Sequence, residues 1–461
     1  MSALWTAPEM QSATLGLMPH AFDATGLSID TRTLKPGDLF IALKDARDGH
    51  DFVRQALEAR AAGALVSRQP DGVGSDAPLL MVANTQRGLE DLARASRIRS
   101  HAKIVAVTGS AGKTTTKEMM RLAYGALGAT HASAASYNNH WGVPLSLASM
   151  PRETAFGIFE VGMNHFGELR SLVSFVRPHV ALVTTIAPAH LEFFGTCEAI
   201  ADAKSEIFEG IVPGGAGLIP ADSPYAERLA ARAKQAGVSR ILRFGAKAGS
   251  DARLIALHDA DDGMKVDADI CGKAVTFRIG AQGAHIAGNA VGALLSVAAL
   301  DGDVLNAAAA LHMFSALKGR GARFRLALAG GAAEIVDESY NANPASMAAA
   351  LSVLGAARAG RRIAVLGDML EMGSEGEAYH AALAREIEAA KVDLVFANGP
   401  QMKALWDALP LSRRGGYGAT SADIAAQVAG AIAPGDVVLV KGSNGSRMNV
   451  VVEALKARAG A

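Results

Sequence analysis

Short apolar runs alternate with longer amphipathic segments along most of the chain. The short runs are typical of buried strands and the amphipathic segments of helices. Between residues 103 and 314 the two signals alternate, which predicts a mostly parallel sheet. Its strand candidates include residues 156–161 and 180–185, and polar residues follow each of them. Alternating residues at 253–279 predict β-hairpins inserted before an Ala-rich helix.

A first α/β unit is predicted ahead of a polar turn at residues 99–103. Amphipathic patterns predict helices at residues 51–62 and 85–99, the second capped by Thr85. The strand candidates of this unit are residues 38–43, 64–66 and 79–82. The pattern therefore predicts a small α/β unit before the larger sheet.

A third unit is predicted after a segment rich in Gly and Arg at residues 318–323. Helical patterns at 344–357 and 377–390 separate its strand candidates, which predicts a second doubly wound sheet. Those strand candidates are residues 334–336, 361–366, 394–397 and 437–440. A chain of 461 residues is too long to fold around a single hydrophobic core, so we expect three domains. Their limits are residues 1–100, 101–314 and 315–461, and the fold class is α/β with a Rossmann-like C-terminal domain.

Composition and charge narrow the classes of function. Acidic and basic residues number 45 each, so no overall field favours nucleic acid or an anionic membrane. Only Cys197 and Cys271 are present, which argues against disulfides or a zinc site and fits a reducing compartment. The first residues lack signal-peptide features, and the apolar window 286–300 is too short to span a membrane. We expect a cytoplasmic protein that binds no nucleic acid and does not insert into membranes.

A strand, a glycine-containing loop and a helix follow one another at residues 105–116. Backbone N–H groups of such a loop bind phosphate, Lys113 can reach a β- or γ-phosphate, and the Thr114 hydroxyl can ligate Mg²⁺. Val107 stands where a strict P-loop has its first glycine, so the loop is a shortened variant. A tight turn with a solvated lysine is the alternative. The loop residues are Gly109, Ser110, Ala111, Gly112, Lys113, Thr114 and Thr115.

Side chains that can bind a metal ion or take part in catalysis also follow neighbouring strand candidates. Glu160 suits Mg²⁺ beside a nucleotide and equally suits a solvated strand end. A lone histidine is more often structural than a ligand, yet His190 follows a further strand of the same predicted sheet. Lys204 lies in a helical stretch where a surface lysine is the simplest interpretation.

Several polar loops are typical both of binding sites and of ordinary turns. Asn138 and Asn139 lie in a segment that reads as a ligand loop or as an Asn-rich turn. Asp337 and Asn341 lie between a strand and a helix, where such groups can hold ribose hydroxyls or begin the helix. In the first unit, the polar loop residues are Ser28, Asp30, Thr31, Arg32, Asp48, Gly49 and His50.

Assembled in order, these motifs resemble the Mur ligases of bacterial cell-wall synthesis. The matching segments are residues 108–115, 160–168, 187–192 and 203–208, and their order and spacing agree throughout. Residues 337–344 and 366–373 look like the D-alanyl-D-alanine-adding branch of this family. The shortened loop is this family's ATP loop, which accounts for Val107.

The resemblance implies roles for the catalytic and metal-binding residues. Lys113 would hold the phosphates of ATP, and Thr114 and Glu160 would bind a first Mg²⁺. His190 would join a second Mg²⁺ site. Lys204 looks like the family lysine that CO₂ converts to a carbamate beside that second site.

The resemblance also implies where the nucleotide and the sugar substrate bind. His285 and Asn289 match the adenine-side segment, and Arg320 matches the phosphate-facing arginine of a hinge. Asp337 and Asn341 match the ribose-side loop. The residues implied in binding the UDP-sugar substrate are Ser28, Asp30, Thr31, Arg32, Asp48, Gly49, His50, Asn138 and Asn139.

The reaction implied is ATP-driven amide formation through an acyl phosphate. UDP-N-acetylmuramoyl-tripeptide and D-alanyl-D-alanine would be the substrates of a monomeric enzyme whose third domain closes about residues 318–321. One alternative is a related ligase with another acceptor, such as a folylpolyglutamate synthase-like enzyme, which the motifs at 337–344 and 366–373 disfavour. The other is a non-catalytic nucleotide-binding module, which the complete set Lys113, Glu160, His190 and Lys204 disfavours.

Overall fold

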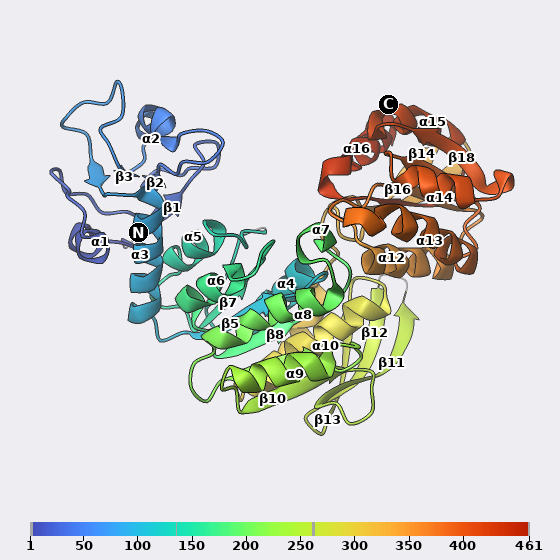
Figure 1. Cartoon of the computed structure of the whole chain (residues 1–461), viewed down its shortest axis with the longest axis horizontal. Coiled ribbons are helices and arrows are strands. Elements are labelled where there is room, and N and C mark those ends of the chain that lie inside the picture. Colours follow the sequence, from blue (N-terminus) through green and yellow to red (C-terminus); the bar gives the residue numbers. More distant parts are fainter. Residues whose placement is uncertain (1–2, 135, 261–262, 460–461) are drawn as a thin grey trace.

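The computed structural model describes residues 3–134, 136–260 and 263–459, and within these ranges the strands form three separate sheets. Figure 1 shows the three resulting units along the longest axis of the molecule, in chain order. All three sheets consist mainly of parallel strands with helices packed on them, as the alternating pattern predicts. The α/β fold class predicted from the sequence is therefore confirmed.

The first sheet is wholly parallel, in the order β1-β2-β3-β4. Its strands are β1 Gly26–Ser28, β2 Asp38–Ile41, β3 Gly63–Val66 and β4 Leu79–Met81, and its helices are α1 Ala7–Thr14, η1 Gly49–Phe52, α2 Val53–Glu58 and α3 Thr85–Arg99. Two details of the prediction are wrong. The helix expected at 51–62 ends at Glu58, and Arg60 adopts a left-handed backbone with φ 68°. The side chain of Asn84, whose backbone is extended, caps α3 in place of Thr85.

The central sheet has the order β13-β12-β11-β10-β9-β8-β5-β7-β6. Its strands are β5 Lys103–Thr108, β6 Thr130–Ala132, β7 Phe156–Glu160, β8 Val180–Val183, β9 Ala216–Pro220, β10 Arg240–Gly245, β11 Ala252–Ala260, β12 Gly263–Ile270 and β13 Lys273–Ile279. The strands from β6 to β11 pair in parallel, and β11, β12 and β13 pair antiparallel. The hairpins predicted at 253–279 are thus a continuation of the sheet, because β11 pairs directly with β10.

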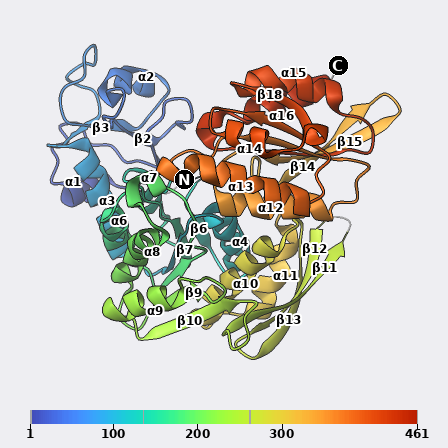
Figure 2. The same ribbon diagram turned by 45° about the vertical axis from the view of Figure 1, so that its right-hand side comes forward.

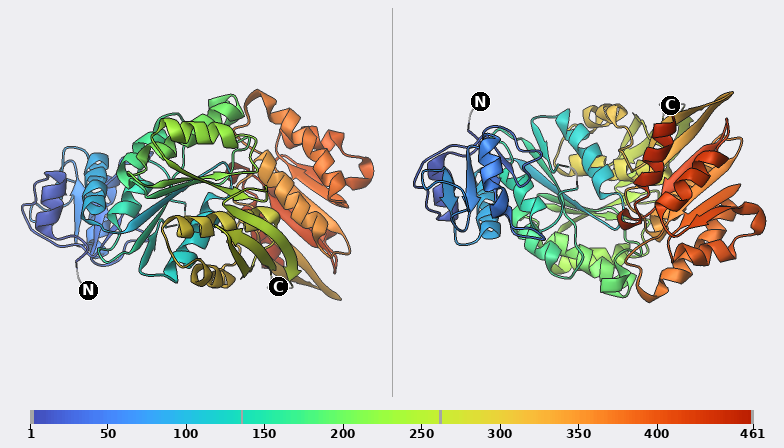
Figure 3. Two further views of the ribbon diagram at one scale, coloured as in Figure 1. Left: turned by 90° about the horizontal axis from the view of Figure 1, so that it is seen from below. Right: turned by 90° about the horizontal axis from the view of Figure 1, so that it is seen from above.

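Helices cover both faces of the central sheet (Figure 3). They are α4 Lys113–Gly125, α5 Gly142–Ala148, α6 Glu168–Val176, α7 Leu191–Phe194, α8 Cys197–Ser205, η2 Glu206–Gly210, α9 Ala226–Gln235, α10 Ala284–Ala299, α11 Val304–Ala310 and η3 Leu311–Met313. Successive residues of β5 point to opposite faces, so Val105 and Val107 join the core under α4 and α10. Ile104 and Ala106 join the core under α5 and α6. Both faces of β5 are therefore buried, and its carboxyl end is held rigidly.

The C-terminal sheet has the order β14-β15-β19-β16-β17-β18 and is parallel except for the edge pair β14–β15. Its strands are β14 Ala322–Leu328, β15 Gly331–Glu338, β16 Arg362–Gly367, β17 Leu394–Asn398, β18 Arg414–Gly418 and β19 Val437–Lys441. Its helices are α12 Pro344–Ala356, η4 Gly373–Glu375, α13 Gly376–Ala389, α14 Met402–Ala408, η5 Leu411–Arg413, α15 Ser421–Ala431, η6 Asn444–Ser446 and α16 Asn449–Ala459. Sequence reasoning missed β18, which has three glycines among its five residues and so lacks the composition of a strand. No described helix is long and apolar enough to cross a lipid bilayer.

Contacts between the first and the central unit include an ion pair of Glu9 with Arg152. Glu9 also accepts hydrogen bonds from the Thr6 backbone and hydroxyl at the start of α1. The Arg152 hydrogen bond lowers the pKa of Glu9 from 4.5 to about 2. The charged carboxylate is therefore the form that the folded protein stabilises.

Replacing Glu9 by Gln should destabilise the protein at neutral pH by about 0.5 kcal/mol, since the partly exposed ion pair with Arg152 is lost while the amide oxygen still accepts from Thr6. Because the folded pKa is lowered, this stabilisation is complete above pH 4.5 and is lost as the pH falls toward 2. Urea unfolding followed by tryptophan fluorescence measures the difference. Glu58→Gln, which removes only an exposed pair at 3.9 Å, is the control. An equal effect of the two substitutions would contradict the prediction.

Candidate active site

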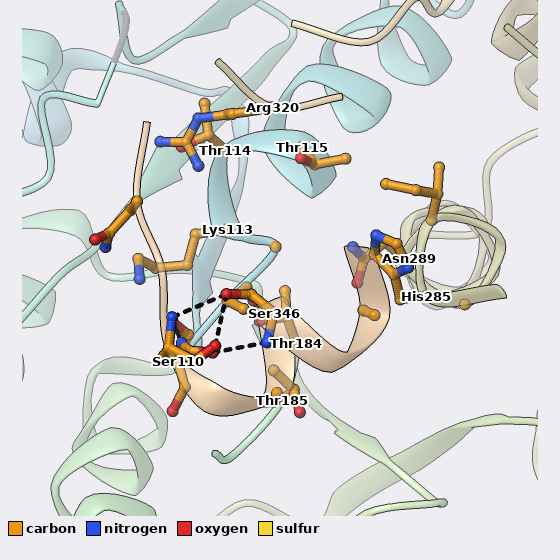
Figure 4. Close-up of a pocket in the computed structure, with 18 of the residues that line it drawn as sticks. Ser110, Lys113, Thr114, Thr115, Thr184, Thr185, His285, Asn289, Arg320 and Ser346 are labelled. Carbon is orange, nitrogen blue, oxygen red and sulfur yellow. Dashed lines mark hydrogen bonds between the residues drawn. The ribbon is translucent and has the colours of Figure 1, made fainter. Parts of the chain in front are cut away.

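A cavity of about 700 Å³ lies where the carboxyl ends of the central strands meet the C-terminal unit. The loop after β5, helix α10 and the segment between β15 and α12 contribute its walls (Figure 4). Figure 2 shows the C-terminal unit above this edge of the central sheet. Ligands gather at the carboxyl ends of strands in open α/β sheets, so the cavity lies where a substrate site is expected.

The loop between β5 and α4 is shaped by its two glycines. Gly109 has φ 151° and Gly112 has φ 80°, conformations that side-chain-bearing residues rarely adopt. A Cβ on Gly109 would lie 1.8 Å from Thr184 Oγ1, and one on Gly112 would lie 2.7 Å from Asn289 Nδ2. Lys113 begins α4, and its Nζ donates to the Gly109 carbonyl at 2.7 Å. The helix N-terminus, the loop amides and this ammonium form a cradle for phosphate.

Substituting Gly112 by Ala should weaken ATP binding by about tenfold, because a left-handed alanine costs about 1–2 kcal/mol and its methyl group displaces Asn289. The KM for ATP measures the effect. Gly125→Ala on the same helix is the control, because nothing lies within 4 Å of the added methyl group. Unchanged ATP affinity in the Gly112 variant would contradict the cradle geometry.

Glu160 ends β7 and lies buried beside the phosphate cradle, with 1% of its surface exposed. Its Oε2 accepts a hydrogen bond from the Thr114 hydroxyl at 2.8 Å, and its Oε1 accepts one from the Asn138 amide at 2.7 Å. Burial lowers the pKa of Lys113, and the nearby charge of Glu160 opposes that shift. A carboxylate and a hydroxyl at a phosphate site are the hard oxygen donors that Mg²⁺ prefers.

The donor set fits Mg²⁺ held jointly with a nucleotide better than a metal held by protein alone. Among the described residues, no cluster of three or more His, Cys, Asp or Glu side chains is placed to hold an ion. Mg²⁺ typically takes only one or two carboxylates and completes its shell with water and phosphate oxygens. Thr114 and Glu160 meet that requirement.

Lys204 is buried in α8, with 1% of its surface exposed, which rules out the surface lysine that its helical pattern suggested. Within the described ranges, no hydrogen bond or ion pair involves its ammonium group. Burial, together with the charge of Lys113, lowers the pKa of Lys204 well below its usual range. Burial therefore favours the neutral amine, which is the nucleophilic form of lysine.

His190 lies at the start of α7 and lines the cavity. Its Nδ1 is 2.5 Å from Oε2 of Glu371, a residue of the C-terminal unit. The hydrogen bond with His190 lowers the pKa of Glu371. The pair joins the central and the C-terminal unit beside the cavity.

The far end of the cavity lies beside α10, where His285 and Asn289 line it as expected. Sequence reasoning missed several other lining residues at the ends of β8, β9 and β10 and in the C-terminal unit. They are Thr184, Thr185, Asp222, Ser223, Phe244 and Ser346. Their positions at strand ends are the signal that could have identified most of them.

The segment that joins the central and C-terminal units also faces the cavity. Arg320 stacks on the Tyr340 ring at 3.8 Å, and its Nη2 donates to Ser136 Oγ at 3.2 Å. Asn341 lines the cavity. Asp337 does not line it: its carboxylate, 2% exposed, accepts from the Gly319 backbone and from Ser339. Asp337 thus fixes the backbone of the joining segment.

The polar loop residues of the first unit lie apart from this cavity. Asp30 pairs with Arg32 at 2.6 Å, and Asp48 bonds His50 Nδ1 at 2.6 Å, while His50 Nε2 accepts from the Ser67 backbone. The Arg32 side chain lowers the pKa of Asp30 to about 2, and the backbone N–H and ring of His50 lower that of Asp48 to about 2. Asn138 lies at the cavity, whereas Asn139 accepts from the Gly142 backbone at the start of α5. Ser28 ends β1, Thr31 donates from its hydroxyl to Gln55, and Gly49 begins η1.

A parallel sheet with a phosphate loop, a buried carboxylate and a facing Rossmann-like unit defines a nucleotide-binding enzyme fold. Residues 107–297 match the Mur ligase middle domain, and residues 322–444 match the Mur ligase glutamate ligase domain. The UDP-N-acetylmuramoyl-tripeptide–D-alanyl-D-alanine ligase of Escherichia coli is 36% identical over 93% of each chain. That of Rickettsia prowazekii is 30% identical over 98% of this chain and 99% of its own.

A crystal structure of MurF from Acinetobacter baumannii superposes with a TM-score of 0.86 at 29% identity, over 98% of this chain and 99% of that chain. The likeness covers nearly the whole of both chains, so the arrangement of the three units is similar in the two structures. The chain belongs to the Mur ligase family.

Proposed function

We propose that this chain joins D-alanyl-D-alanine to UDP-N-acetylmuramoyl-tripeptide and converts ATP to ADP and phosphate. The product would be the pentapeptide precursor of peptidoglycan. The observation that carries this proposal is that relatives named for this activity match nine tenths or more of this chain. The phosphate cradle facing the C-terminal unit supports it, because three reactants must meet between units.

The chemistry requires activation of a carboxylate, since an unactivated carboxylate is a poor acyl donor. The terminal carboxylate oxygen of the tripeptide attacks the γ-phosphorus, the bond to the β-phosphate oxygen breaks, and ADP leaves. The amine of D-alanyl-D-alanine then attacks the acyl carbon, and phosphate leaves as the amide forms and the amine loses a proton. Lys113 holds the phosphates, and its positive charge opposes the charge that develops on them.

Thr114 and Glu160 would hold Mg²⁺ at the phosphates, and His190 and Lys204 would hold a second ion. Bound Mg²⁺ supplies positive charge that neutralises the phosphates and orients them. Asn138 keeps the Glu160 carboxylate in place through its amide hydrogen bond. Burial of Glu160 excludes water from its oxygens.

Lys204 would carry the carbamate. Its neutral amine attacks CO₂, a nitrogen–carbon bond forms, and one proton is released to water. A buried lysine without an ion-pair partner in the described ranges suits this modification, because burial disfavours the ammonium form and the charge of Lys113 would stabilise the carbamate anion.

The remaining residues would bind the two nucleotides. His285 and Asn289 face the adenine, Arg320 the phosphates and Asn341 the ribose, while Asp337 acts through the backbone of Gly319 and Ser339. The UDP-sugar would lie on the first domain and reach two residues of the central domain. The residues of the first domain are Ser28, Asp30, Thr31, Arg32, Asp48, Gly49 and His50, and those of the central domain are Asn138 and Asn139. We also propose domain limits at 1–100, 101–314 and 315–461, a monomer, and a cytoplasmic site of action.

Phosphate release from ATP tests the proposal. We expect release that requires both UDP-N-acetylmuramoyl-tripeptide and D-alanyl-D-alanine. Release with glutamate and a folate in their place would identify a folylpolyglutamate synthase-like ligase. Absence of release from folded protein that still binds ATP would favour a non-catalytic module.

A further inference from the structure

Two loops from different units meet at the mouth of the cavity. Nδ1 of His190, in the central unit, lies 2.5 Å from Oε2 of Glu371, in the C-terminal unit. The Glu192 backbone N–H also donates to the Glu371 carbonyl at 3.1 Å. A Cβ on Gly373 would lie 3.5 Å from Glu192 Cα, so there is room for little more than a methyl group between these two backbones. The contact therefore involves main chain as well as side chains.

The loop that carries Glu371 is fixed within its own unit on both sides. Met369 N–H donates to His380 Nε2 at 2.9 Å, and Leu370 N–H donates to Ser443 Oγ at 2.9 Å. Asp368, 4% exposed, accepts from the Met402 backbone at 2.8 Å. These bonds fix the backbone that leads into Glu371 through contacts made within the C-terminal unit alone.

Both members of the pair adopt an uncommon backbone conformation. His190 has φ 58° and Glu371 has φ 60°, in the left-handed region that residues with side chains seldom occupy. Such conformations persist where the surroundings determine them, and they concentrate at functional sites. Here each one points a functional side chain at the other across the boundary between units.

We propose that Glu371 is a positioning residue for His190 and that the C-terminal domain delivers it when it docks on the central domain. The Glu371 carboxylate accepts the Nδ1 proton, which fixes one tautomer and leaves the lone pair of Nε2 for a ligand in the cavity. When the C-terminal domain docks on the central domain, Glu371 thereby fixes the orientation and the tautomer of His190. This inference rests on the proposed function, because it assigns His190 to the ligase site.

The first test reads the tautomer of His190 in metal-free protein without substrates. Long-range proton–nitrogen NMR correlation on protein with nitrogen-labelled histidine, above pH 7.5, distinguishes an Nδ1-bound from an Nε2-bound proton, and His190→Gln assigns the resonance. We expect the Nδ1–H form in the wild type, the Nε2–H form in Glu371→Ala, and the wild-type result in Glu375→Gln. Glu375 is an exposed residue of the same loop, which makes it the matched control. A wild-type His190 with its proton on Nε2, or no change in Glu371→Ala, would overturn the inference.

The second test measures steady-state ligation. Glu371→Ala should lower kcat by about 10- to 100-fold and leave the KM for ATP nearly unchanged. Glu371→Asp should recover part of the lost kcat, since a carboxylate remains, and Glu375→Gln should match the wild type. A lower melting temperature with unchanged kcat would mark a merely structural ion pair and overturn the inference. If the wild type lacks ligase activity, the proposed function fails, whereas the tautomer result still decides whether Glu371 positions His190.

Discussion

Lys113→Ala is expected to reduce ligation by about 10³-fold, the largest effect of any substitution considered for the phosphate cradle. Lys113 places an ammonium group against the loop that follows β5. Its Nζ lies 2.7 Å from the Gly109 carbonyl oxygen. An alanine removes this positive charge and leaves the backbone amides to hold the phosphates alone. The rate of phosphate release with all three substrates at saturation measures the loss.

Lys103→Ala is the matched control for this substitution. Lys103 begins the same strand, β5, and its exposed side chain lies at the end of the strand opposite the loop. The control should therefore keep the wild-type rate. Ligation by Lys113→Ala within a few fold of the wild type would remove the loop lysine from the mechanism.

Lys204→Ala is expected to reduce ligation by about 10²-fold, comparable to the loss of a group that orients a reacting centre. The lysine is buried, lacks an ion-pair partner in the described ranges, and has a pKa well below its usual range because of burial and the charge of Lys113. If its carbamate supplies the missing anion, millimolar acetate or formate should restore part of the activity of the alanine variant. Lys234→Ala, on the exposed face of α9, is the control.

The same account predicts a dependence on CO₂. Wild-type protein prepared in CO₂-depleted buffer should lose activity and regain it when bicarbonate is added. Full activity after depletion, together with no rescue of Lys204→Ala by carboxylates, would contradict a carbamate at this position. An inactive variant that no longer folds is identified by circular dichroism.

The phosphate cradle was predictable because its chemistry is local. Gly109, Gly112 and Lys113 need only a strand before them and a helix after them, and these follow from short-range hydrophobic patterns. Glu160 was predictable as a strand-end residue, although its bonds to Thr114 and Asn138 depend on packing between elements far apart in the chain.

Other features depend on tertiary contacts that no local pattern encodes. Lys204 has the sequence environment of a surface lysine, and only the packing of α8 buries it. Asp337 follows a strand as a ligand residue would, yet nearby backbone groups already satisfy its carboxylate. The pairing of Glu371 with His190 spans 181 residues and two units. The family resemblance supplied roles for most of these residues, whereas their contacts required the structure.

The most direct test of the account follows one oxygen atom through the reaction. UDP-N-acetylmuramoyl-tripeptide labelled with oxygen-18 in its terminal carboxylate is incubated with ATP, D-alanyl-D-alanine and the enzyme, and the products are analysed by mass spectrometry. The account predicts the pentapeptide product and one labelled oxygen in each released phosphate, because the carboxylate oxygen that attacks the γ-phosphorus leaves with it. Pentapeptide formed with unlabelled phosphate would contradict the acyl-phosphate intermediate. Labelled tripeptide recovered unchanged after incubation with folded protein that binds ATP would contradict the proposed reaction itself.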